Sequence, residues 1–90
     1  MIKKYSISKF EGENLFSVVA EIVCIKSQLG WAVGVLLDIP FKNFTILEMA
    51  DGKIRIETNR VANDKELKNI VACLEEFNFV ENKTKKEGDK

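Results

Sequence analysis

Residues 44–59, which read FTILEMADGKIRIETN, contain the clearest structural signal in this 90-residue chain. Two runs of alternating apolar and polar residues flank Asp51-Gly52, a dipeptide that accepts the positive φ angles of a two-residue type I′ turn. The pattern predicts a β-hairpin whose strands are residues 44–50 and 53–59.

The two-residue turn also fixes the register of the hairpin and therefore its two faces. It places Glu48 opposite Arg55, on a face that also holds the apolar residues Phe44 and Ile46. The opposite face is the predicted core face, with Leu47, Met49, Ile54 and Ile56. An apolar spot with charges around it on a free sheet face is typical of a protein-binding patch. The candidate interface is the following set: Phe41, Phe44, Ile46, Glu48, Arg55 and Glu57.

A helix is predicted over residues 64–77. Asn63 is suited to cap its first turn, and Glu66 three positions later completes a capping box. Asn78 suits the left-handed position that often ends a helix, with Phe79 folding back on the last turn. Apolar residues recur at helical spacing on one side of this segment: Leu67, Ile70, Val71, Leu74 and Phe77.

Residues 13–30 carry conflicting signals. Asn14 is suited to start a helix and Gly30 to stop one. Polar or small residues also fall on one narrow helical stripe: Ser17, Glu21, Cys24 and Gln28. β-branched residues are dense in the same segment, and these favour a strand. The prediction is a helix, because the start and stop signals agree with the stripe, and a strand is the alternative.

Residues 31–39 are predicted to form a strand that ends at Pro40. Ala32 and Gly34 make one side of this strand small enough for another element to approach closely. A more weakly patterned strand is predicted at the N-terminus, over residues 3–10.

These elements together predict a two-layer α+β domain in the order β-α-β-β-β-α, with two helices covering one face of an antiparallel sheet. The alternative is a mostly-β meander or partly open barrel of five strands with one C-terminal helix. Residues 1–80 form the single predicted domain, since a chain of this length has room for one core. Residues 81–90 hold no apolar side chain to bury, and we expect a charged, disordered tail there.

The composition argues against several chemistries. Fourteen basic residues balance fourteen acidic ones, so no basic excess exists to track a phosphate backbone, and no nucleic-acid partner is expected. Histidine is absent, which removes the commonest general base and most zinc sites. Cys24 and Cys73 are too few for a structural zinc site or a disulfide framework, and we expect buried thiols in a reducing compartment. No catalytic residue, metal or cofactor is predicted.

Charged and polar residues interrupt the longest apolar stretch, residues 15–41, so no membrane span is expected and the predicted location is the cytoplasm. The leading functional prediction is a small protein-interaction or assembly module that forms homo-oligomers or binds a small protein. The rival is a small-ligand-binding domain with a pocket between the first helix and the 31–39 strand, at Trp31, Gly34 and Asp38. An enzyme ranks third, because no pair of its titratable residues has a diagnostic spacing. The alternative to an interface on the hairpin is an ordinary exposed ion pair across its strands.

Overall fold

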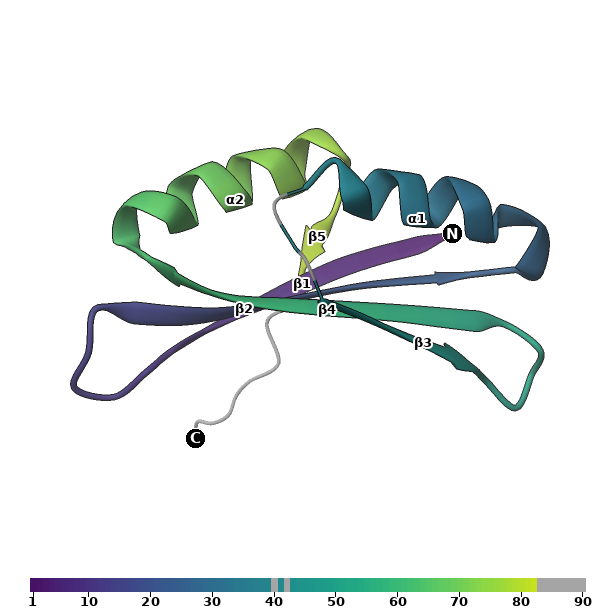
Figure 1. The fold of residues 1–90 in the computed structure, drawn as a ribbon, viewed down its shortest axis with the longest axis horizontal. Helices are drawn as coiled ribbons and strands as arrows, with labels where there is room; N and C mark the ends of the chain where they lie inside the picture. The colour runs from purple at the N-terminus through teal and green to yellow at the C-terminus, as the bar shows by residue number, and fades with distance from the viewer. Residues whose placement is uncertain (40, 42, 83–90) are drawn as a thin grey trace.

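The computed structural model describes residues 1–39, 41 and 43–82, and it has the predicted α+β class. Its elements are β1 (Ile2–Lys9), β2 (Leu15–Cys24), the short 3-10 helix η1 (Lys26–Gln28), α1 (Leu29–Leu37), β3 (Asn43–Glu48), β4 (Ile54–Asn63), α2 (Asp64–Glu76) and β5 (Val80–Glu81). The five strands form one sheet in the order β3-β4-β2-β1-β5. This sheet is mixed rather than antiparallel throughout, because β5 runs parallel to β1. Both helices lie on the same side of the sheet (Figure 1).

β2 is the central strand, and it replaces the helix predicted over residues 13–30. It pairs with β1 and with β4 along its whole length, so that Ala20 lies opposite Tyr5 on one side and Thr58 on the other. Alternate residues from Val18 to Cys24 are fully buried, and those between them are half-buried. The strand alternative is therefore confirmed for residues 15–24. A strand with neighbours on both edges favours the β-branched residues that are dense here.

The first helix is α1, and it occupies the segment predicted to be a strand over residues 31–39. Ala32, Val35 and Leu36 recur at helical spacing and are buried. The helix ends at Leu37, and the chain reaches Pro40 soon afterwards, as expected for a residue that disfavours helix before it. The observed order of elements is β-β-α-β-β-α-β instead of the predicted β-α-β-β-β-α.

β3 and β4 form the predicted hairpin, but its loop has three residues rather than two. The Gly52 N–H donates to the Met49 carbonyl at 2.9 Å, and the Met49 N–H donates to the Lys53 carbonyl at 2.7 Å. Gly52 has a φ of 85°, whereas no positive φ occurs at the residue before it. This is a type I turn followed by a one-residue bulge, in place of the predicted type I′ turn. The register shifts by one residue, so that Ile46 lies opposite Ile56.

α2 begins and ends as predicted. The Asn63 Oδ1 accepts from the Glu66 N–H at 2.8 Å, and the Glu66 Oε1 accepts from the Asn63 N–H at 3.2 Å, which completes the capping box. Asn78 has a φ of 67°, and the Phe79 N–H donates to the Leu74 carbonyl at 2.9 Å. Phe79 is buried, so it does fold back on the last turn.

The core lies between the helices and one face of the sheet (Figure 1). We call this side the helix face; it holds the even-numbered residues of β2, β3 and β4 and the odd-numbered residues of β1. The other side, the open face, has no described helix over it. The largest fully buried apolar side chains are Val18, Ile22, Leu36, Ile39, Ile56, Ile70 and Leu74.

β5 is a short strand at the C-terminal end of the described chain. Val80 pairs with Lys4, and the Asn82 N–H donates to the Tyr5 carbonyl at 2.7 Å. The boundary predicted between domain and tail at residue 81 therefore falls inside β5. Residues 83–90 of the predicted tail lie outside the described residues.

Candidate functional site

The one-residue shift in register divides the predicted interface between the two faces of the sheet. Phe44, Ile46 and Glu48 lie on the helix face, and Arg55 and Glu57 lie on the open face. The prediction that these five residues share one face is therefore wrong. The physical reason is the extra loop residue, because a slip of one position moves every side chain of a strand to the opposite face.

β3 itself remains as the candidate site, because two of its apolar side chains are exposed. Ile46 is 52% exposed and Leu47 is 53% exposed, on opposite faces of the strand. Phe44 is half-buried against the core. Phe41, which was predicted to belong to the interface, is buried in the core instead.

β3 is an outermost strand of the sheet, so one row of its backbone groups faces no other strand among residues 1–39, 41 and 43–82. Backbone hydrogen-bonded pairs alternate with non-bonded pairs along an antiparallel ladder. Because Met49 is bonded to Lys53, the odd-numbered residues of β3 are the ones bonded to β4. The N–H and C=O groups of Phe44, Ile46 and Glu48 therefore point away from β4, toward the free edge.

The opposite edge of the sheet differs in its chemistry. There β5 covers β1 only at Lys4 and Tyr5. β1 also carries Lys3 and Lys9, and β5 has only two residues. Short edge strands and lysines are devices that prevent sheets from pairing edge to edge. β3 has six residues, with no proline or lysine and with one charged side chain, Glu48.

The single charge of β3 is paired within the chain. The Lys26 Nζ lies 2.9 Å from the Glu48 Oε2, and both side chains are more than half exposed. An exposed pair of this kind adds little to the free energy of unfolding. It does offset the negative charge beside the free edge, which lowers the electrostatic cost of bringing another strand close.

Arg55 bridges two carboxylates on the open face. Glu21 and Glu57 are direct partners on β2 and β4, an arrangement that places like charges opposite each other. The Arg55 Nη2 lies 3.1 Å from the Glu21 Oε1 and 3.0 Å from the Glu57 Oε2. Arg55 therefore offsets a repulsion within the sheet, and it faces Leu47 rather than the predicted Glu48.

The residues predicted to line a ligand pocket lie along α1 and at its end. Trp31 is 58% exposed, and Gly34 and Asp38 are exposed as well. The predicted pocket lacks one of its walls, because residues 31–39 do not form a strand and most of this segment is the first helix itself. A β-carbon added at Gly34 would meet nothing within 4 Å, so this glycine does not mark a close approach inside the chain.

Lys3 is a residue whose role the sequence analysis missed. Its Nζ donates to the Phe77 carbonyl at the C-terminal end of α2 at 2.6 Å, and it lies 5.4 Å from the centre of the Trp31 ring on α1. A cation is favourable both at a helix C-terminus and over an indole face. Lys3 thus ties β1 to both helices. One feature of the sequence indicated this role: strand alternation places Lys3 on the same side of β1 as Tyr5 and Ile7, which face the core.

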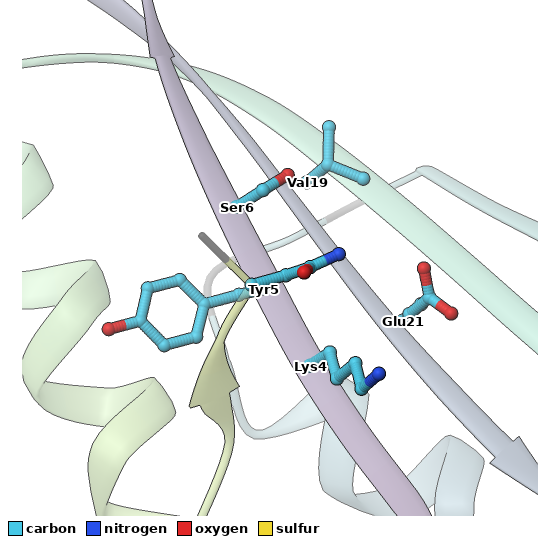
Figure 2. Close-up of a pocket in the computed structure, with 6 residues that line it drawn as sticks. Lys4, Tyr5, Ser6, Val19 and Glu21 are labelled. Carbon is cyan, nitrogen blue, oxygen red and sulfur yellow. The ribbon is translucent and has the colours of Figure 1, made fainter. Parts of the chain in front are cut away.

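A small hollow opens beside β1 on the open face (Figure 2). Lys4, Ser6, Val19 and Glu21 lie around it, whereas the ring of Tyr5 points toward the helices. Its volume is about 20 Å³, enough for about one water molecule. This hollow is too small to hold a ligand. Two larger open hollows, of about 220 Å³ beside Cys24 and about 180 Å³ beside Arg60, are also smaller than the roughly 300 Å³ at which ordinary ligand pockets begin.

Tyr5 makes the free energy of unfolding depend on pH in the alkaline range. Burial of its phenol, followed by the Glu81 and Glu75 carboxylates, raises the pKa of Tyr5 above its ordinary value. A raised pKa in the folded state contributes stability that is present below the ordinary pKa of about 10 and is lost as pH rises through the folded-state pKa. We expect the free energy of unfolding to fall more steeply above about pH 10 in the wild type than in Tyr5→Phe. Urea unfolding at a series of pH values checks this, and parallel curves for the two proteins would contradict it.

Within residues 1–39, 41 and 43–82, no group of three or more His, Cys, Asp or Glu side chains could hold a metal ion. Cys24 is buried, Cys73 is half-buried, and both are free thiols. None of the described helices is long and apolar enough to cross a bilayer. Comparison of the chain with protein-family models, curated proteins and solved structures found no match.

Proposed function

We propose that this chain is a protein-assembly module whose copies associate through β3. The observation that carries the proposal is the free edge of this strand, beside which Ile46 and Leu47 are each more than half exposed. An edge strand with exposed apolar side chains, and without lysine, proline or a described helix over its edge, is a surface that can pair with another chain. The two free cysteines support the cytoplasm as the proposed location, since unpaired thiols persist in reducing compartments.

A small-ligand-binding function has less support. The segment that was expected to form one wall of the pocket is a helix with an exposed outer side, where Trp31 and Leu37 are 58% and 64% exposed. Ligand sites are concave and bury most of their ligand, and a convex helix surface does not provide such a site. The assembly module is therefore the function that the geometry favours.

The proposal predicts that Ile46→Lys leaves the fold intact and abolishes association. A lysine at this exposed position is tolerated in the monomer, but lysine on an edge strand disfavours pairing of that edge with another strand. We expect light scattering at about 500 μM to give a mass above that of one chain for the wild type and the mass of one chain for the variant. Circular dichroism should show the same helix and strand content in both proteins.

The matched control is Leu37→Lys, which places the same charge at an exposed apolar position on α1, away from β3. We expect this variant to associate like the wild type. A wild type that stays monomeric at about 500 μM would refute the proposed function. A loss of association in the Leu37 variant alone would show that the assembling surface is α1.

A further inference from the structure

We infer that the partner strand is β3 of a second copy, running antiparallel and paired in a register centred on Ile46, so that the two five-stranded sheets become one continuous sheet across a two-fold axis. This inference rests on the proposed function and adds the geometry of the complex. Association through a backbone ladder differs from association of two apolar patches, and the two modes respond differently to substitution.

The outward backbone groups restrict the register. The N–H and C=O groups that point to the free edge belong to Phe44, Ile46 and Glu48, so these residues must be the hydrogen-bonded ones in any pairing with a second β3. A two-fold axis at Ile46 places Ile46 opposite its own copy and Phe44 opposite Glu48 of the second copy. In this register the five residues from Phe44 to Glu48 all have partners in the second β3 strand. Each bonded pair exchanges two N–H···O=C hydrogen bonds.

The charges agree with this register. The only charged side chain of β3, Glu48, faces an uncharged phenylalanine rather than its own copy, and Lys26 of the same chain lies 2.9 Å from it. A register centred on Glu48 would place two carboxylates opposite each other, which is destabilising in a sheet. Charge therefore favours the axis at Ile46 over an axis at the end of the strand.

The difference between the two sheet edges predicts a closed assembly. Pairing of β3 with the opposite edge of another copy would generate an open filament, because each added chain would again expose a β3 edge. That opposite edge carries Lys4 and Lys9 on β1 and is covered in part by β5. Pairing of β3 with β3 uses the free β3 edge of each of the two chains. The assembly is therefore complete as a dimer.

The affinity that follows is moderate. A single strand pair with few flanking side chains lies at the low end of interface sizes, below the roughly 1,200 Å² of standard complexes. We therefore expect a dissociation constant in the range of about 1–100 μM. This range makes both the monomer and the dimer accessible to one sample at different concentrations.

The test is amide hydrogen exchange of the full chain, measured by NMR at about 5 μM and about 500 μM. Ladder formation predicts that exchange of the Ile46 amide slows by about threefold or more at the higher concentration, because most chains are then in the hydrogen-bonded dimer. The Leu47 amide, which is bonded to β4 in the monomer, is the internal control and should change little. Exchange of the Phe44 and Glu48 amides should slow with concentration in the same way as that of the Ile46 amide.

A matched pair of variants separates the backbone from the side chain. Ile46→Ala shortens the side chain but keeps the N–H, whereas Ile46→Pro also removes the N–H at a position where no bond to β4 is lost. The inference predicts that the alanine variant still forms dimers, with a dissociation constant raised about tenfold or less, and that the proline variant forms none. Equal dissociation constants for the alanine and proline variants would overturn the inference that the chains associate through a backbone ladder.

The outcomes separate the two claims. A dimer whose Ile46 amide exchanges equally fast at both concentrations would overturn the ladder and leave the assembly function standing. A chain that is monomeric at both concentrations would overturn both claims. If the proline variant fails to fold, the exchange rates of the wild type still decide the question.

Discussion

Ile56→Ala is expected to lower the free energy of unfolding by about 2–5 kcal/mol, whereas Ile46→Ala should lower it by less than about 1 kcal/mol. The two isoleucines lie opposite each other on β4 and β3 and on the same face of the sheet. Ile56 is 0% exposed and Ile46 is 52% exposed. The difference arises because truncation of Ile56 leaves a cavity under the helices, while solvent already reaches Ile46.

Urea unfolding at a chain concentration below about 1 μM measures both losses without a contribution from association. Equal losses for the two variants would contradict the position of β3 at an uncovered edge. A larger loss for Ile46→Ala would show that the helices cover β3 rather than β4.

The second large effect is expected at Arg55. Arg55→Met should lower the free energy of unfolding by about 1–2 kcal/mol, because the Glu21 and Glu57 carboxylates then face each other without a bridging cation. Both carboxylates and Arg55 itself are partly exposed, so water screens the repulsion and keeps the loss below that of a fully buried pair. The Arg55 Nε is buried without a hydrogen-bond partner, and its removal offsets part of the loss.

The control for this prediction is the double variant Arg55→Met/Glu57→Gln, in which one of the facing carboxylates is neutral. It should be more stable than Arg55→Met alone, although it lacks one more charged group. Thermal unfolding at low and high salt measures the effect, and added salt should reduce the deficit of Arg55→Met. A double variant no more stable than the single one would show that repulsion between the carboxylates is not the cause.

Local signals in the sequence were sufficient wherever one element is specified by its own residues. The capping box of Asn63 and Glu66 and the left-handed Asn78 define α2 at both ends, because capping depends on hydrogen bonds between residues close in the chain. The two strands of the β3–β4 hairpin were predicted for the same reason. The pairing of β5 with β1 connects distant segments and left no such local signal.

The helix predicted over residues 13–30 was wrong because the residues suited to helix ends received more weight than the β-branched residues between them. Asn14 lies in the loop between β1 and β2, and Gly30 lies within α1, so neither residue bounds a helix over this segment. The polar stripe was also misleading, since Ser17 and Glu21 face the open side of the sheet as alternate residues of a strand. A central strand that is apolar on both faces shows little period-2 contrast, and its length then resembles that of a helix.

The secondary structure of the α1 segment could not be predicted from the spacing of its apolar residues. Residues 29–37 read LGWAVGVLL and contain no charged residue, so a strand pattern and a helix pattern fit equally well. The structure decides between them through burial of Ala32, Val35 and Leu36 at helical spacing.

The candidate site was predicted in part. The sequence pointed to Phe44, Ile46 and Glu48 as a group, and the structure keeps these residues together on one side of β3 with their backbone groups at the free edge. Arg55 and Glu57 were assigned to the same face because Asp51-Gly52 suits both a two-residue turn and the end of a three-residue loop. That choice of loop decides every face assignment of the hairpin.

Sedimentation equilibrium of the wild-type chain from about 1 μM to about 1 mM decides whether the chain forms a closed dimer through β3, since it measures both association and the largest species formed. Antiparallel pairing of β3 with β3 predicts a single equilibrium between one chain and two, with no larger species at any concentration. A chain that stays monomeric to about 1 mM, or a mass that keeps rising beyond two chains, would contradict it.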